Sequence, residues 1–142
     1  MSMTYGADPG AQLQTRRNHQ RNVAAAATAV DLNTDVIQCE TDGVVTAVSY
    51  VPAATITGAA TNNRTVNLVN KGAAGAGTTV IATLNFASGV NATADIAKVI
   101  TLSGTAANKA VVAGDVLQWQ SVHVGTGIAD PGGLAVVQIS RY

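Results

Sequence analysis

The sequence predicts an all-β protein: a single jelly-roll-like antiparallel β-sandwich with an extended N-terminal arm. Its 142 residues are the length of one ordinary domain. The apolar residues come in short runs rich in Val, Ile and Thr, and Gly, Asn, Asp and Pro separate these runs, which is the pattern of strands joined by turns. No stretch has the length and period of an ordinary amphipathic helix. Together these observations predict one β-sandwich core.

The chain is expected to divide near residue 22, into an arm over residues 1–22 and a sandwich domain over residues 23–142. The arm is polar and contains one acidic residue. It also carries three of the eight basic residues, which are Arg16, Arg17 and Arg21. A segment of this composition buries too little apolar surface to form a core of its own.

Seven strands are predicted beyond the arm, each a short run enriched in β-branched or aromatic residues. They are expected over residues 35–40, 44–51, 65–69, 79–86, 98–102, 116–124 and 134–139. In the run 116–124, Leu117 and Trp119 share one face. The alanine-rich residues 24–29 fit either a helix or an additional first strand, and residues 91–97 fit one helical turn.

The connections between these strands are typical of hairpins and sheet crossovers. Residues 72–77 contain three glycines and are expected to form a flexible link, and residues 113–115 form a turn entry. Residues 130–133 have the sequence Asp-Pro-Gly-Gly, in which proline presets φ and glycine accepts a positive φ. Short strands separated by such turns favour a sandwich or jelly roll.

The chain carries unusually few charges. Charged residues make up 11% of it, against about 25% in an ordinary domain, and the formal net charge is zero. We therefore expect much of the surface to be covered in an assembly or to consist of Thr, Asn, Ser and Gln. The neutral balance argues against a nucleic-acid-binding protein. No apolar run approaches the roughly 18 residues of a membrane-spanning helix, and the first residues lack the pattern of a secretory signal.

No constellation of catalytic or metal-ligating residues is apparent, so neither an enzyme nor a cofactor is predicted. The single cysteine, Cys39, excludes an internal disulfide and is expected to be a small buried residue. The two histidines, His19 and His123, lack metal-ligand spacing, and His123 is expected at a packing or subunit contact. There is no Gly-x-Ser-x-Gly motif, and Lys71 precedes the glycine-rich run instead of following it as in a phosphate-binding loop.

Two sets of residues are nevertheless candidates for contacts. The arginines Arg16, Arg17 and Arg21 fit either a solvated tail or a segment that docks on an acidic neighbouring protein, because guanidinium groups pair well with carboxylates. Tyr50 and Trp119 are expected to pack in the core or at a subunit contact.

Three stretches resemble small head decoration proteins of tailed bacteriophages, especially those of actinobacterial hosts. They are residues 48–65, with an Asn-Asn-Arg turn, residues 113–121, with a Gly-Asp entry to a strand containing Trp, and residues 125–133, with the Asp-Pro-Gly-Gly turn. The likeness spans residues 36–141 and does not cover the arm. It implies a jelly-roll subunit without enzymatic activity or cofactor, which forms homotrimers on the outer surface of an icosahedral capsid.

The resemblance makes the major capsid protein the expected partner, with Arg16, Arg17 and Arg21 contacting its carboxylates and the trimer stabilising the shell across capsomer junctions. Neither direct nucleic-acid binding nor a membrane is expected. Two alternatives stay open, because a fold does not fix a function. One is an adhesion or carbohydrate-binding module on the phage surface that uses loops 57–64 and 125–133. The other is a head-fibre base or minor tail subunit.

Overall fold

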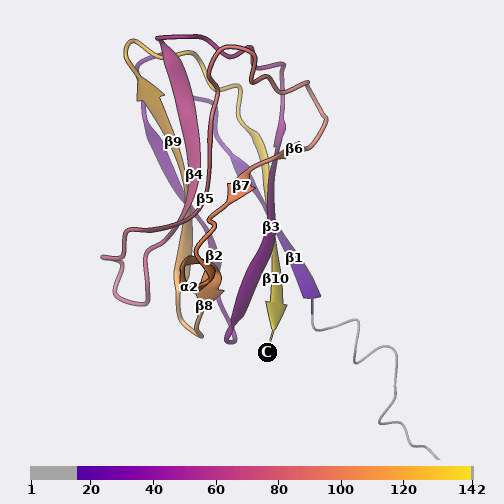
Figure 1. Ribbon diagram of the computed structural model, residues 1–142, viewed down its shortest axis with the longest axis vertical. Coiled ribbons are helices and arrows are strands. Elements are labelled where there is room, and N and C mark those ends of the chain that lie inside the picture. The colour runs from indigo at the N-terminus through magenta and orange to yellow at the C-terminus, as the bar shows by residue number, and fades with distance from the viewer. Residues whose placement is uncertain (1–15, 142) are drawn as a thin grey trace, which may run out of the picture.

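Two antiparallel sheets pack face to face in the computed structural model, which describes residues 16–141 (Figure 1). The first sheet has the order β1-β10-β3-β6, and β8 also pairs with β3. Its strands are β1 (Arg16–Val23), β10 (Gly133–Arg141), β3 (Gly43–Pro52), β6 (Lys98–Val99) and β8 (Ala110–Val111). The second sheet has the order β2-β9-β4-β5-β7. Its strands are β2 (Leu32–Gln38), β9 (Val116–Val124), β4 (Asn63–Asn70), β5 (Thr79–Asn85) and β7 (Thr101–Leu102).

The predicted fold class is confirmed: the described chain is an all-β, jelly-roll-like sandwich. Between β7 and β8 lies one turn of helix, α2 (Ala106–Lys109). Residues 24–29 form neither a helix nor a strand, only an isolated bridge from Ala26 to Asp130. Residues 91–97 form no helical turn. Their one bridge joins Ala92 to Ile56.

The boundary expected near residue 22 is corrected by strand β1. Residues 16–22 belong to β1, which pairs with β10 along its whole length, from Arg16 opposite Ser140 to Val23 opposite Gly133. This strand shows no alternation of apolar and polar residues in the sequence, because it lies at the edge of its sheet and most of its side chains are exposed. The rest of the expected arm, residues 1–15, lies outside the described residues.

The strand predicted over residues 98–102 is two short strands in different sheets. β6 pairs with β3 in the first sheet, and β7 pairs with β5 in the second. Ile100 lies between them, is fully buried, and donates its backbone N–H to Val48 O at 2.9 Å. The chain therefore crosses from one sheet to the other at a residue that the core encloses.

The core lies between the sheets and follows the period of two that strands impose. In β9 the inward residues Leu117, Trp119 and Ser121 are buried, while the residues between them are partly exposed. Cys39 is also buried, as expected. Burial raises the pKa of its thiol to about 11, with a smaller contribution from the nearby charge of Asp115, so the thiol stays protonated at neutral pH.

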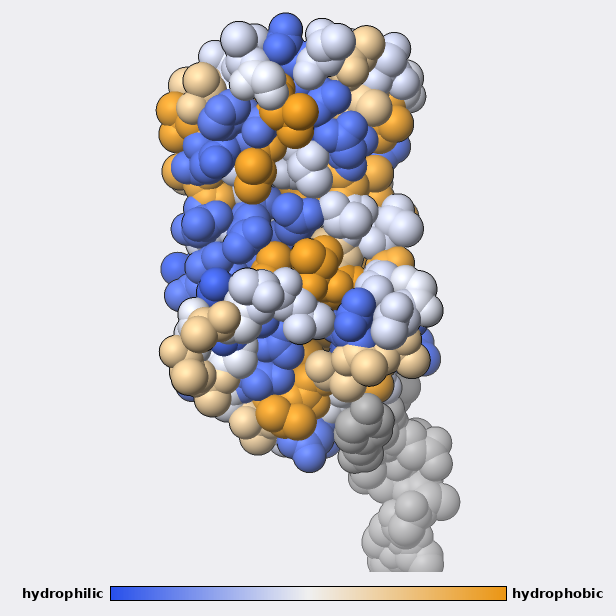
Figure 2. Space-filling view, turned by 60° about the vertical axis from the view of Figure 1, so that its left-hand side comes forward, coloured by the Kyte–Doolittle hydropathy of each residue, from blue (hydrophilic) through white to orange (hydrophobic). Residues whose placement is uncertain are grey.

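The outer face of the second sheet is polar but almost uncharged. Amide and hydroxyl groups on neighbouring strands bond to one another: Thr83 donates to Asn67 at 2.6 Å, and Asn85 donates to Thr65 at 2.8 Å. Figure 2 brings this side of the molecule forward and shows hydrophilic and apolar side chains interleaved over it. This face accounts for part of the low charge through Asn, Gln and Thr, one of the two explanations expected from the sequence.

The two ends of the sandwich differ in character. At the terminal end, β1 begins and β10 finishes beside the turn at residues 39–42 (Figure 1). At the loop end lie three connections, residues 24–31, 53–62 and 125–132, because Val23 and Pro52 both pair with Gly133. Each end of the sandwich therefore offers a separate candidate contact site.

Candidate functional site

The arginines singled out from the sequence lie on one strand but not on one face. Side chains alternate along β1, so Arg17 and Arg21 point to the core side, together with His19 between them. Their partners in β10 are the inward-facing Ile139 and Ala135, which are buried. Arg16 points to the outer side. Strand β1 therefore places Arg17 and Arg21 on one face, four residues apart, and Arg16 on the other.

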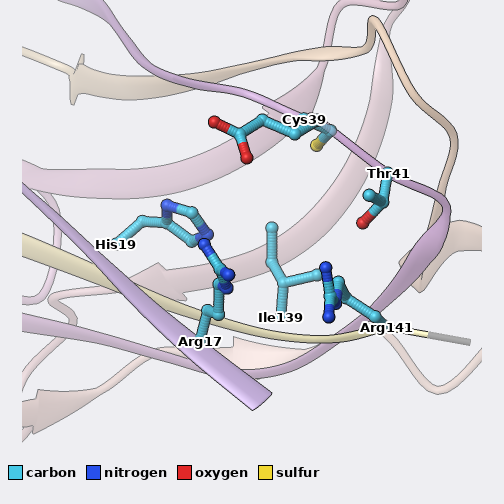
Figure 3. Close-up of a pocket in the computed structure, with 7 residues that line it drawn as sticks. Arg17, His19, Cys39, Thr41, Ile139 and Arg141 are labelled. Carbon is cyan, nitrogen blue, oxygen red and sulfur yellow. The ribbon is translucent and has the colours of Figure 1, made fainter. Parts of the chain in front are cut away.

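A hollow at the terminal end is lined by part of this basic strand (Figure 3). Its cavity volume is about 20 Å³. Its walls come from β1, from the end of β10 and from the turn that joins β2 to β3. The lining residues are Arg17, His19, Cys39, Glu40, Thr41, Ile139 and Arg141.

Arg141 is a site residue that sequence reasoning missed. The last strand was expected to end at residue 139, whereas β10 continues to Arg141. Arg17 lies opposite Ile139, so Arg141 is its diagonal neighbour across the strand pair and lies on the same face. The available signal was that Arg141 lies two residues after the inward-facing Ile139, which places both side chains on the same face of a strand.

The positive charges of this hollow have no ion-pair partner within the described chain. The single ion pair found among residues 16–141 joins His123 to Asp31, at the other end of the sandwich. Glu40 lines the same hollow, but its carboxylate lies beyond 4.0 Å from the guanidinium groups. Arg17 and Arg141 thus share a partly enclosed hollow with Glu40, which forms no ion pair with either of them.

Tyr50 and Trp119 lie in the core of the single chain. Their exposed fractions are 0% and 1%, and their ring centroids are 5.4 Å apart at an interplanar angle of 45°. Such burial within one chain leaves neither ring accessible for a subunit contact. The Tyr50 hydroxyl donates to Asp130 at 2.6 Å, and burial followed by this hydrogen bond raises the tyrosine pKa well above its usual range.

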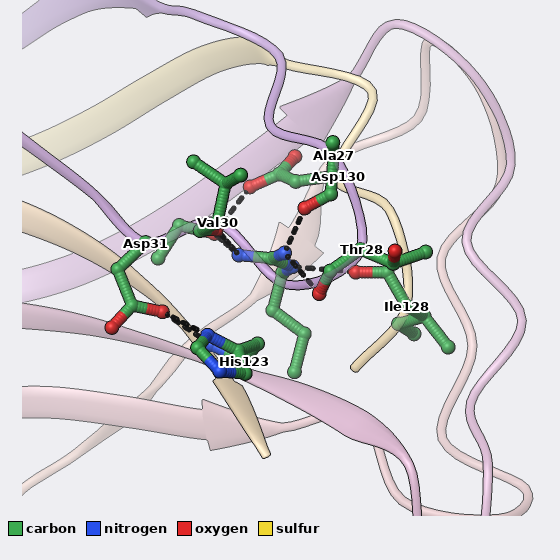
Figure 4. Close-up of polar contacts among 9 residues, drawn as sticks. Ala27, Thr28, Val30, Asp31, His123, Ile128 and Asp130 are labelled. Carbon is green, nitrogen blue, oxygen red and sulfur yellow. Dashed lines mark hydrogen bonds and ion pairs between the residues drawn. The ribbon is translucent and has the colours of Figure 1, made fainter. Parts of the chain in front are cut away.

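The loop end is organised by Arg64, a buried residue that sequence reasoning did not single out. Arg64 is 1% exposed, and all five of its N–H groups donate (Figure 4). The acceptors are Ile128 O at 2.8 Å, Val30 O at 3.1 Å, Ser121 Oγ at 3.0 Å, Ala27 O at 2.9 Å and Thr28 O at 3.3 Å. One side chain on β4 therefore holds two loops and strand β9 together.

Asp130 supplies the balancing negative charge through Ser121. The Ser121 hydroxyl accepts from Arg64 and donates to Asp130 at 2.6 Å. Asp130 is 2% exposed and also accepts from Tyr50 and from the backbone N–H of Gly132 at 3.0 Å. Gly132 adopts φ +75°, which favours glycine in this turn. The Arg64–Ser121–Asp130–Tyr50 network, hereafter the buried network, joins the Asp-Pro-Gly-Gly turn to the Asn-Asn-Arg sequence, whose last two residues begin strand β4 instead of forming the expected turn.

His123 lies at the rim of the loop end, paired with Asp31 (Figure 4). Its ring Nδ1 is 2.6 Å from Asp31 Oδ1, and its backbone N–H donates to the same oxygen at 2.8 Å. The side chains are 32% and 47% exposed. Asp31 thus orients His123, and the pair is a surface contact between the 24–31 loop and strand β9.

This pair predicts a pH-dependent contribution to stability. The backbone hydrogen bond from His123, followed by the side-chain one, lowers the pKa of Asp31 below its ordinary 3.8. A lowered pKa stabilises the fold above pH 3.8, and this contribution is lost as the pH falls through the lowered value. We expect Asp31→Asn to be less stable than the wild type at about pH 6 and the gap to narrow as the pH falls below 3.8. Urea unfolding at several pH values measures this, and a gap that does not change with pH contradicts it.

The described residues hold no group of three or more His, Cys, Asp or Glu side chains placed to bind a metal ion. No helix between residues 16 and 141 is long and apolar enough to cross a membrane. No family model, curated protein or solved structure matches the chain.

Proposed function

We propose that this protein is a structural component of a bacteriophage virion. In this proposal it decorates the outer surface of the icosahedral capsid, binding the major capsid protein as a homotrimer across capsomer junctions and so stabilising the shell. The similarity of residues 36–141 to head decoration proteins suggested this role. No chemical step is required, because a subunit that bridges several capsomers adds contacts that must break before they separate.

The observation that carries the proposal is the basic edge strand β1. Arg16, Arg17 and Arg21 occupy an exposed strand at the edge of the first sheet, and no carboxylate among the described residues pairs with them. Unpaired arginines on a sheet edge suit a protein partner that presents carboxylates. Their like charges also oppose pairing of this edge with a second β1, which keeps the strand available.

Capsid binding tests the proposal, using heads assembled from the major capsid protein of the phage that encodes this chain. The full-length protein is expected to co-sediment with such heads in a saturable way. The triple substitution Arg16→Ala, Arg17→Ala and Arg21→Ala is expected to weaken binding by about tenfold or more, because rim charges steer and orient the encounter. The matched control, Lys71→Ala, Lys98→Ala and Lys109→Ala, removes as many positive charges elsewhere and is expected to bind normally.

Two outcomes would contradict the proposal. Without saturable binding of the wild type, the capsid role is wrong. Equal binding by the arginine and lysine variants would remove β1 from the interface. Light scattering on the purified protein measures its mass and so its oligomeric state. A homotrimer of 14.3 kDa chains has an expected mass of about 43 kDa.

The loop end supports a second candidate, a carbohydrate-binding adhesion module. The loops expected to serve such a role contact each other, since the backbone N–H of Thr126 donates to Asn62 Oδ1 at 3.0 Å. The buried network fixes the base of both loops, which would reduce the entropy lost on binding a glycan. Binding of the isolated protein to uncharged glycans on an array, without binding to capsids, would favour this function over capsid decoration.

A further inference from the structure

We infer that the hollow lined by Arg17 and Arg141 is a binding site for the carboxylate of a glutamate side chain on an acidic partner segment. This inference deepens the proposed function and rests on it for the protein that supplies the segment. The proposed function involves the exposed arginines along β1. The inference assigns one hollow, the two arginines that line it and the chemical group that they bind.

Electrostatics favour a carboxylate in this hollow. Arg17 and Arg141 are diagonal neighbours on one face of the β1–β10 pair, where like charges repel. His19 lines the same hollow, and its one acid, Glu40, lies beyond ion-pair distance of both guanidinium groups. A guest carboxylate between the two guanidinium groups would relieve this repulsion and accept charge-assisted hydrogen bonds from both.

The shape and polarity of the hollow also fit the end of an acidic side chain. Figure 3 shows Arg17, His19 and Arg141 on one side of the hollow and Thr41 on the other, with Ile139 between the two arginines. The cavity volume of about 20 Å³ is enough for little more than one water-sized group, so the hollow suits the end of a side chain and is too small for a cofactor.

The lining of the hollow favours a side-chain carboxylate over a phosphate. Ile139 and Cys39 are each 5% exposed and contribute an apolar part to the lining. The methylene groups of a glutamate can contact this apolar part, which a free phosphate cannot do. Glu40 in the same hollow also disfavours a doubly charged anion more than a single carboxylate.

The test uses a blocked penta-glutamate peptide, a blocked penta-glutamine peptide and inorganic phosphate as separate probes, titrated into isotope-labelled full-length protein and followed by NMR. Penta-glutamate is expected to shift the backbone amide signals of Arg17, His19, Thr41 and Arg141. Penta-glutamine is expected to shift none of them. Phosphate binding at least as strong as that of penta-glutamate would identify a general anion site and overturn the inference.

Charge-matched variants locate the binding. The pair Arg17→Gln with Arg141→Gln is expected to weaken penta-glutamate binding about tenfold or more, whereas Lys98→Gln with Lys109→Gln is expected to leave it unchanged. The pair Arg17→Lys with Arg141→Lys keeps both charges but loses the planar guanidinium groups, which can each form two hydrogen bonds to one carboxylate. An intermediate loss of penta-glutamate affinity is therefore expected. Equal binding by wild type and the glutamine pair would overturn the site.

The same variants separate this inference from the proposed function. Capsid binding that persists in the Arg17→Gln, Arg141→Gln protein, together with no peptide binding by the wild type, overturns the hollow and leaves capsid decoration standing. Peptide binding that depends on both arginines, in a protein that does not bind capsids, supports the hollow and overturns capsid decoration.

Discussion

Arg64→Met is expected to lower the free energy of unfolding by about 3–5 kcal/mol, which in a domain of this size is a fall of about 10 °C or more in Tm. The substitution keeps an unbranched side chain of similar length but removes five N–H donors. Four backbone carbonyls and the Ser121 hydroxyl would each lose a hydrogen bond from the guanidinium group. Asp130 would also stay buried without the positive charge that balances it.

Urea unfolding of both proteins measures the loss, and Lys109→Met serves as the control because it removes a positive charge from a partly exposed position. That control is expected to change stability by no more than about 0.5 kcal/mol. A loss under about 1 kcal/mol for Arg64→Met would mean that water replaces the guanidinium without penalty and that the network contributes little.

A double substitution tests whether Arg64 and Asp130 act together. Asp130→Asn also removes a buried charge, so Arg64→Met and Asp130→Asn in one chain leave no uncompensated charge. The double variant is therefore expected to lose less stability than the sum of the two single variants. Hydrogen exchange adds a local readout: the reciprocal backbone bonds between Ala26 and Asp130, both 2.9 Å, should lose protection first.

The central strands, which have a neighbouring strand on each side, could be predicted from the sequence. Burial of one face makes apolar and polar residues alternate along such a strand. β9 has the predicted bounds, 116–124, and β5 and β4 differ from the expected ranges only near their ends. The strand β1 could not be predicted in this way. Most of its side chains are exposed on both faces, so its structure depends on hydrogen bonds to β10, more than a hundred residues away in sequence.

The candidate sites were less predictable than the fold, and for the same reason. The arginines of β1 stood out as a cluster in the sequence, but their division between two faces depends on the register with β10. Arg64 carried no local signal. The carbonyls that it binds lie 34–37 and 64 residues away in the chain, so only the folded molecule brings them together.

Trp119→Ala is expected to cost about 3–5 kcal/mol, because it removes the largest of the fully buried side chains and leaves a cavity in the middle of the core. The ring stands on β9 opposite Leu68 of β4 and packs against Tyr50, whose hydroxyl belongs to the buried network. The cavity therefore removes packing from a residue that also holds Asp130. Thermal and urea unfolding both measure this loss.

Trp119→Phe is the informative comparison, because the indole Nε1 has no hydrogen-bond partner among the described residues. A buried donor without a partner costs about 1–3 kcal/mol, and phenylalanine removes that cost while keeping an aromatic ring beside Tyr50. The gain offsets much of the lost volume, so Trp119→Phe is expected to cost no more than about 1.5 kcal/mol. If phenylalanine destabilises the domain as much as alanine does, the indole N–H contributes to stability and has a partner such as a buried water. A small loss for phenylalanine and a large one for alanine would show that Trp119 acts through its volume and its ring alone.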